Sequence, residues 1–161
     1  MISKMIKTDI IIIGAGPVGL FAVFEAGLLN MKCHLIDILP KPGGQCIELY
    51  PKKPIYDIPA YPEILAGDLI KNLLKQCSQF QPGFTLAERA EKFEKLKDGN
   101  FLITTDKGTR HCAPVVVIAG GLGGFQPRKP NFEALSNYEN KGVCYFVKDP
   151  KKFKNKNIII S

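Results

Sequence analysis

A glycine-rich turn between two apolar stretches limits the folds open to this chain more than any other part of it. The stretch Asp9–Ile13 contains four successive isoleucines, which is typical of a strand buried on both faces in a parallel sheet. The turn Gly14–Gly19 follows directly, and the apolar stretch Pro17–Asn30 predicts a buried helix that begins at a proline. Lys32–Asp37 predicts a second strand, which completes a β-α-β unit. We therefore expect an α/β fold.

The turn has the pattern G-x-G-x-x-G, and each glycine has a physical role. Gly14 permits a tight turn, Gly16 lets a pyrophosphate approach bare backbone, and Gly19 allows the helix to pack closely on the sheet. The helix that begins at Pro17 offers free N–H groups and a partial positive charge to phosphates. Asp37 ends the second strand, where it can accept a hydrogen bond from a ribose hydroxyl and disfavours a 2′-phosphate. The pattern predicts a dinucleotide site but does not distinguish NAD from FAD.

The rest of the chain alternates between loops, strands and one further helix. Ile38–Pro62 is rich in proline and glycine, so we expect it to wrap around a ligand. Apolar residues at helical spacing predict an amphipathic helix over Ala66–Phe80, and the turn Asp98–Asn100 predicts an antiparallel meander. Strands are predicted at Phe84–Ala87, Glu91–Lys97, Phe101–Thr105, Val115–Ile118, Val143–Val147 and Asn157–Ser161.

The charge of the chain is unevenly distributed. The 22 Lys and Arg exceed the 15 Asp and Glu, which gives a formal net charge of +7. Lys141–Lys156 contains six lysines and a single acidic residue, Asp149. No RNP, helix-turn-helix or zinc-finger pattern accompanies these lysines, so we interpret them as a solvated surface and expect no nucleic-acid partner.

The five cysteines are odd in number and widely spread, with no C-x-x-C pair and no zinc spacing. This pattern is typical of reduced thiols, so we expect a cytoplasmic protein without a metal site. No apolar run approaches the roughly 18 residues of a transmembrane helix, so we expect no membrane contact. Cys46 has no second cysteine nearby and is interpreted as a small buried residue. His34 and His111 are expected to be structural.

Five segments of the chain resemble the two-domain flavoprotein pyridine-nucleotide reductases, and within them the thioredoxin-reductase-like ferredoxin–NADP reductases of bacteria. The glycine turn and the Gly-Gly-Gln are shared with low-molecular-weight thioredoxin reductases, whereas the Leu-Tyr-Pro and Ile-Tyr-Asp segments favour the ferredoxin reductases. The segments that carry the resemblance are Ile12–Phe21, Leu39–Gln45, Leu49–Lys53, Ile55–Ile58 and Ile118–Gly121.

The resemblance implies a Rossmann-like, three-layer FAD-binding fold with a parallel sheet and an antiparallel β-meander, followed by the start of a second Rossmann domain. Residues 1–125 would form the FAD-binding domain, and residues 126–161 a linker and the beginning of an NADP-binding domain. The implied reaction is hydride transfer from NADPH to the flavin, followed by one-electron steps to ferredoxin or flavodoxin. A homodimer is implied for the full-length protein, and the lysines of residues 141–156 are expected to help attract an acidic ferredoxin.

The resemblance also assigns site residues, although none of them as a catalytic residue. Tyr50 is implied to stack on the isoalloxazine ring, Ala90 to contact the adenosine end through its backbone, and Phe125 to contact the flavin. Gln45 is implied to contact the flavin region, and Asp37 the ribose. The full set of implied cofactor-binding residues is Gly14, Gly16, Pro17, Gly19, Asp37, Gly44, Gln45, Tyr50, Ala90 and Phe125.

Three other interpretations of the sequence stay open. They are a thioredoxin reductase, a fragment of an NAD-dependent Rossmann dehydrogenase, and a non-catalytic basic binding module. The chain also resembles only the first part of the family's length, because Ser161 falls at the end of what looks like the first strand of the NADP-binding domain. We therefore expect the 161-residue chain alone to bind FAD weakly or not at all, and not to turn over NADPH.

Overall fold

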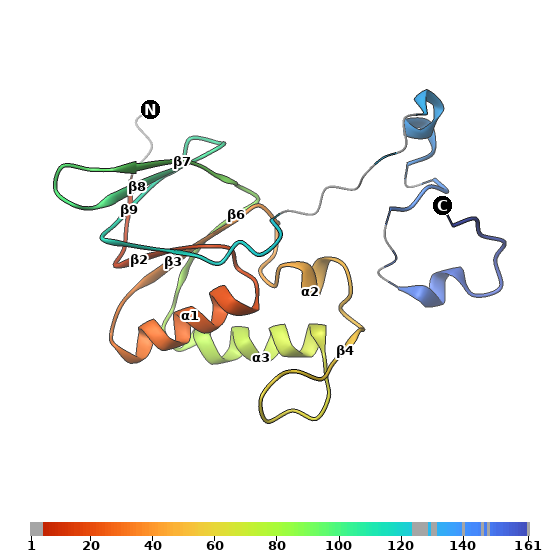
Figure 1. The fold of residues 1–161 in the computed structure, drawn as a ribbon, viewed down its shortest axis with the longest axis horizontal. Coiled ribbons are helices and arrows are strands. Elements are labelled where there is room, and N and C mark those ends of the chain that lie inside the picture. Colours follow the sequence, from red (N-terminus) through yellow and green to blue (C-terminus); the bar gives the residue numbers. More distant parts are fainter. Residues whose placement is uncertain are drawn as a thin grey trace.

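Residues 5–123, 129, 132–139, 141–145, 147 and 149–160 are described by the computed structural model. Up to residue 123 the chain forms three layers, which are two helices, a parallel sheet and an antiparallel sheet (Figure 1). The parallel sheet lies in the middle, so both of its faces are covered.

The middle layer contains four strands that all run in the same direction. The strands at Ile10–Ile13 and Val115–Ile118 are continuous apolar runs. The central pair of the sheet has a neighbouring strand on both sides, which encloses the isoleucines of Ile10–Ile13. In spatial order the strands are β10 (Val115–Ile118), β2 (Ile10–Ile13), β3 (Cys33–Asp37) and β6 (Gly83–Leu86).

The two long helices, α1 (Pro17–Leu28) and α3 (Ala66–Ser78), contact each other and cover one face of this sheet. Side chains from both helices and from β2 and β3 form an apolar core, in which Leu20, Ile12 and Leu35 have no exposed surface. The helix α1 begins at Pro17 as predicted, and Asn30 follows it with a positive φ of 59°. Asn30 thus supplies the left-handed residue that commonly ends a helix.

The antiparallel sheet covers the opposite face. Its strands meet the parallel sheet in a second core, in which Ile11 and Ile36 pack with Ile103 and Ala113. A turn at Asp98–Asn100 joins two of its strands, as the sequence predicted. In spatial order the strands are β1 (Ile6–Lys7), β9 (Arg110–Ala113), β8 (Phe101–Thr105) and β7 (Ala90–Lys95), and β1 is parallel to β9.

The proline- and glycine-rich segment after β3 contains three short elements. A single helical turn, α2 (Gln45–Glu48), contacts α3, and β4 (Pro54–Ile55) pairs antiparallel with β5 (Ile64–Leu65). These elements and β1 were not predicted, because each is too short to show a periodic pattern. The strand β9 was also missed, because its sequence, RHCA, is neither an apolar run nor a clear alternation. The predicted α/β fold with a parallel sheet and an antiparallel meander is confirmed.

The two strands predicted near the end of the sequence are corrected by the structure. Val143 makes only an isolated bridge with Glu139, and Asn157–Ile160 has no regular structure. An apolar run becomes a strand only when another strand pairs with it, and within the described ranges none pairs with either segment. Two 3₁₀ helices lie outside these segments: η1 (Glu133–Tyr138) precedes the first, and η2 (Pro150–Phe153) lies between the two.

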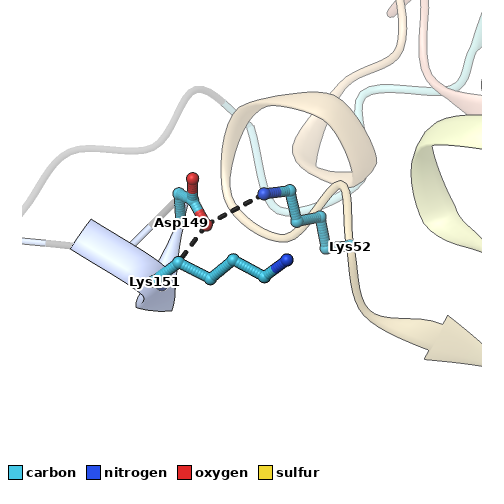
Figure 2. A network of polar contacts seen from close by, with 3 residues as sticks. All are labelled: Lys52, Asp149 and Lys151. Atoms are coloured by element: carbon cyan, nitrogen blue, oxygen red, sulfur yellow. Dashed lines mark hydrogen bonds and ion pairs between the residues drawn. The ribbon is translucent and has the colours of Figure 1, made fainter. Parts of the chain in front are cut away.

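An ion pair links the later part of the chain to the segment after α2. Lys52 Nζ lies 2.9 Å from Asp149 Oδ1, and the main-chain N–H of Lys151 donates to the same oxygen (Figure 2). Asp149 therefore caps the N-terminus of η2 while it binds Lys52. The hydrogen bond from Lys52 holds the pKa of Asp149 below its ordinary value.

Membrane and metal features are absent from the part of the chain that the structure describes. Its helices are too short or too polar to span a bilayer. Nor do three His, Cys, Asp or Glu side chains come together there as metal ligands.

Candidate functional site

The glycine turn lies where the middle strands of the parallel sheet end. Gly14 has a φ of +104°, which side chains other than that of glycine rarely allow, and a Cβ there would collide with the carbonyl of Ala119 after β10. The N–H of Gly14 donates to Ile36 O at 2.8 Å, so the turn is fixed to β3. Gly19 lies behind the turn, where a Cβ would collide with the carbonyl of Gly14. Both glycines therefore satisfy steric requirements of the turn itself.

Asp37 connects the turn to the strand that it ends. Its side chain is buried, with Oδ2 accepting from the N–H of Ala15 at 2.6 Å and Oδ1 from the N–H of Leu39 at 2.8 Å. The carbonyl of Ala15 in turn accepts from the N–H of Gly43 at 2.7 Å. A carboxylate has about four acceptor positions, so Asp37 can still accept hydrogen bonds from a ligand. Asp37 thus helps to shape the glycine turn, which the sequence did not predict.

A cavity of about 440 Å³ opens beside the turn and brings the predicted residues together. Its polar groups come from the ends of β3 and β6 and from α2, which are far apart in the sequence. Eight of the ten predicted cofactor-binding residues line it: Gly14, Gly16, Pro17, Asp37, Gly44, Gln45, Tyr50 and Ala90. Gly19 does not line the cavity, and Phe125 lies outside the described residues.

The wall formed by α2 and the following turn carries an aromatic ring. Tyr50 lines the cavity, and its carbonyl accepts from the N–H of Lys53 at 3.0 Å. The Nζ of Lys53 lies 5.4 Å from the centre of the Tyr50 ring, within the range of a cation–π contact. Burial raises the pKa of the Tyr50 hydroxyl, and the nearby Cys46 acts in the same direction. Tyr50 therefore presents a neutral ring whose position is fixed by local contacts.

A second wall of the cavity is formed by the connection between β6 and β7. Glu88, Arg89 and Ala90 line the cavity there, and Ala87 before them has a positive φ of 56°. The main chain of Arg89 makes two hydrogen bonds with Asp106. The N–H of Arg89 donates to Asp106 Oδ1, and the carbonyl of Arg89 accepts from the N–H of Asp106, both at 2.9 Å. This wall is thus a specific local structure rather than a simple loop.

The carboxylate of Glu88 is positioned by two threonines. The hydroxyl of Thr105 donates to Glu88 Oε2 at 2.6 Å. Partial burial acts to raise the pKa of Glu88, but hydrogen bonds from Thr105 and Thr109 outweigh it and leave the pKa below its ordinary value. Glu88 therefore stays ionised beside the cavity at neutral pH.

Some residues of the cavity were not singled out from the sequence as ligand contacts. Arg89 and Leu122 gave no pattern, because each depends on a turn that brings distant segments together. Gly120 and Gly121 did give a signal, since they follow a buried strand in the same manner as the glycine turn. The further lining residues are Ile13, Val18, Ile36, Ile38, Leu39, Cys46, Glu48, Glu88, Ala119 and Gly123.

The glycine turn, the acid that ends the next strand and the cavity at the carboxyl ends of parallel strands define a Rossmann-type dinucleotide-binding fold. The sequence profile of the family described as pyridine nucleotide-disulphide oxidoreductase matches residues 8–158. The chain belongs to this family.

Curated relatives with high sequence identity are named ferredoxin–NADP reductases. Ferredoxin–NADP reductase 2 of Christiangramia forsetii is 67% identical over 157 residues, which are 98% of this chain and 44% of the relative. The enzyme of Flavobacterium johnsoniae is 65% identical over 98% of this chain and 45% of its own length. The enzyme of Rickettsia rickettsii is 52% identical over 98% of this chain and 46% of its own length. The chain thus spans less than half the length of these relatives.

Solved structures with lower identity share the fold. Thioredoxin reductase from Lactococcus lactis superposes with a TM-score of 0.66 and 23% identity, over 86% of this chain and 43% of its own. A closed form of cyclohexanone monooxygenase superposes with a TM-score of 0.63 and 22% identity, over 83% of this chain and 29% of its own. At these identities the likeness shows the fold alone.

Proposed function

We propose that this chain forms the FAD-binding part of a ferredoxin–NADP reductase, a flavoprotein that moves electrons between NADPH and ferredoxin. The observation that carries the proposal is Asp37, which is bonded to the glycine turn at the edge of the cavity. The names of the relatives at 65% and 67% identity support the choice of reaction. Because those relatives are about twice as long, the proposal concerns the activity of a protein of their full length.

Gly16, Pro17 and Gly44, which line the cavity, suit a pyrophosphate. A Cβ on Gly44 would lie 3.1 Å from the Cα of Gly16, so a side chain there would fill the space between them. The helix α1 begins at Pro17 and has no side-chain cap, which leaves its positive end available to an anion. In the proposal the FAD pyrophosphate binds at Gly16 and Pro17, and Asp37 accepts from the adenosine ribose.

The two walls of the cavity suit the two ends of FAD. We assign the flavin end to Gln45 and the Tyr50 ring, which can stack on a flat heterocycle, and the adenosine end to the main chain of Ala90. Phe125 remains an expected flavin contact. When bound, FAD accepts a hydride from NADPH and releases electrons singly to the acceptor, and the protein residues position it.

The proposal also extends to organisation and partners. Residues 1–125 form the FAD-binding part, and residues 126–161 a linker and the beginning of an NADP-binding part. The acceptor is ferredoxin or flavodoxin, the full-length protein is a homodimer, and it works in the cytoplasm, where its five free cysteines would stay reduced. The exposed Lys151, Lys152 and Lys154 provide positive charge that attracts an acidic acceptor.

A chimeric enzyme tests this proposal. Residues 1–161 would replace the matching part of the Flavobacterium johnsoniae relative, with the parent enzyme as the reference. We expect the chimera to purify with FAD and to reduce ferredoxin with NADPH, and the same chimera carrying Asp37→Ala to lose FAD. A folded chimera that purifies without FAD, although the parent enzyme retains it, would contradict the proposal.

A further inference from the structure

Two histidines and a threonine form a hydrogen-bonded chain between the two sheets. Thr85 Oγ1, on β6, lies 2.8 Å from His34 Nε2 on β3 and 2.8 Å from His111 Nε2 on β9. The two imidazole rings lie 4.9 Å apart, centre to centre. Because β3 and β6 belong to the parallel sheet and β9 to the antiparallel sheet, this chain joins the two layers by side-chain hydrogen bonds.

The surroundings of both rings oppose a positive charge. His111 has no exposed surface, and Ile6 on β1 and Ile103 on β8 are its partners in the sheet. Burial lowers the pKa of His111, and it outweighs the charge of Glu88 and the main chain of Ile103, which both act to raise this pKa. At neutral pH His111 is therefore uncharged.

His34 is half-buried, and its surroundings also favour the uncharged imidazole. Its neighbours in the sheet are Ile11 on β2 and Gly83 on β6, neither of which carries charge. Burial lowers its pKa to about 4, and the nearby His111 acts in the same direction. The chain contains these two histidines and no others, so both of its imidazoles belong to this network.

The protons of the network can be placed from its geometry. A hydroxyl has one proton, so Thr85 satisfies both contacts when it donates to one ring and accepts from the other. His111 Nδ1 is buried without a hydrogen-bond partner among the described residues, and a bare nitrogen there costs less than a buried N–H. His111 Nε2–H therefore donates to Thr85, and Thr85 donates to His34 Nε2. The two histidines hold opposite tautomers.

A proton on His34 is incompatible with this arrangement. Protonated Nε2 can no longer accept, so the hydroxyl proton of Thr85 loses its acceptor. If the chain reverses instead, His111 must hold a buried Nδ1–H, which forms no hydrogen bond of good geometry among the described residues and has only the main chain of Ile103 near it. Either way one buried donor lacks a good hydrogen bond, which weakens the contact between the sheets.

The network lies three residues before two residues that line the cavity, Asp37 and Glu88. His34 precedes Asp37 on β3, and Thr85 precedes Glu88 after β6. The N–H of Glu88 donates to the carbonyl of Asp37 at 3.1 Å, and the N–H of Ala87 to Leu39 O at 3.0 Å. A loosening of β6 and β9 would therefore reach the main-chain bonds that hold these residues together.

We propose that His34, Thr85 and His111 form an acid-sensitive latch that fixes the antiparallel sheet to the parallel sheet and keeps the cavity wall at Ala87 and Glu88 in place. The latch is closed when both imidazoles are neutral. It opens when the pH falls, because the first proton removes an acceptor that the network cannot replace.

The sign of the pH dependence follows from the lowered pKa values. A free histidine in the unfolded chain binds a proton below about pH 6.5, whereas the folded latch does not. The stability of the latch is therefore complete above pH 6.5 and falls as the pH drops toward 4. The unfolding equilibrium constant should rise about tenfold per pH unit for each histidine that resists protonation.

Imidazole NMR of the 161-residue chain tests the tautomers and the titration directly. We expect two sets of imidazole signals with opposite tautomers at neutral pH, and His34 still neutral well below pH 6.5. Identical tautomers, or two histidines that both titrate near pH 6.5, would overturn the proposal.

Amide hydrogen exchange tests whether the network acts as a latch. After correction for intrinsic rates, Ala87 and Glu88 should open more often at pH 5 than at pH 7. Thr85→Val keeps the branched shape but removes the hydroxyl, so it should show at pH 7 the faster exchange that the wild type shows at pH 5. Thr85→Ser keeps the hydroxyl and serves as the matched control.

Two outcomes of the exchange experiment would contradict the latch. One is exchange at Ala87 and Glu88 that does not depend on pH in the wild type. The other is a Thr85→Val protein that exchanges as slowly as Thr85→Ser. His34→Gln provides a further measurement, because glutamine can bond to Thr85 but does not titrate, and it should remove about a tenfold change per pH unit from the unfolding constant.

Discussion

Two isoleucine runs in this chain differ in structure and in burial. Ile10–Ile13 forms the central strand β2, in which Ile11 and Ile12 have no exposed surface, whereas Ile159 and Ile160 are 99% and 87% exposed and belong to no strand. The first run pairs with β3 and β10 and is covered on both faces. An isoleucine run therefore marks a possible strand, and pairing and covering layers decide whether the strand forms.

The same substitution in both runs gives the largest expected contrast. Ile12→Ala should lower the free energy of unfolding by about 3 kcal/mol, because it leaves a cavity in the core between helices and sheet. Ile159→Ala should leave it unchanged within error, because that side chain contacts mainly solvent. Urea denaturation of both variants measures the difference. Equal losses would show that the second run is buried in solution.

Two glycines near the cavity give a second comparison between a closely packed position, Gly19, and an open one, Gly120. Gly19→Ala should cost about 1–3 kcal/mol, because its Cβ would collide with the carbonyl of Gly14 and α1 would have to move. Gly120→Ala meets no atom within 4 Å and should be nearly neutral. Thermal unfolding of the pair tests this, and a neutral Gly19→Ala would mean that α1 packs less closely on the turn.

Two aspartates give a contrast of about the same size. Asp37→Asn should cost about 1–3 kcal/mol, because one of two buried main-chain N–H groups loses its charged acceptor. Asp149→Asn should leave stability unchanged within error, since its pair with Lys52 is accessible to solvent. Urea midpoints measured at low and high salt check both. A marked loss in Asp149→Asn would show that this pair fixes the later part of the chain.

The sequence predicted the parts of the fold that rest on local pattern and steric need. The glycine turn, α1, α3 and the four parallel strands each have a periodic or glycine signal that spans several residues. By contrast, the bonds from Asp37 to Ala15 and Leu39, and the position of Arg89, depend on segments that meet only after folding. The strand predicted at the second isoleucine run was wrong, because a run of isoleucines does not show whether another strand will pair with it.

The candidate site was predictable to a similar degree. Gly16 and Asp37 follow from the pattern of the turn, whereas Tyr50 and Ala90 came only from a resemblance to a family. Nothing in the sequence placed Thr85 between His34 and His111, because three strands from two sheets must meet to form that contact. Long-range pairing thus accounts for most of what sequence analysis missed.

Binding of FAD to the 161-residue chain tests the central claim, that the cavity is a dinucleotide site organised by Asp37. The amide signals of Gly14, Gly16 and Asp37 would be followed by NMR during titration with FAD, with ADP and NAD as comparisons. We predict that FAD and ADP shift these signals, even if binding is weak, and that Asp37→Ala weakens both at least about tenfold through loss of its hydrogen bonds. A folded chain whose signals stay unchanged at high FAD and ADP concentrations, together with a folded chimera of residues 1–161 that also purifies without FAD, would contradict the claim. A response to NAD but not FAD would show that the cofactor was misassigned.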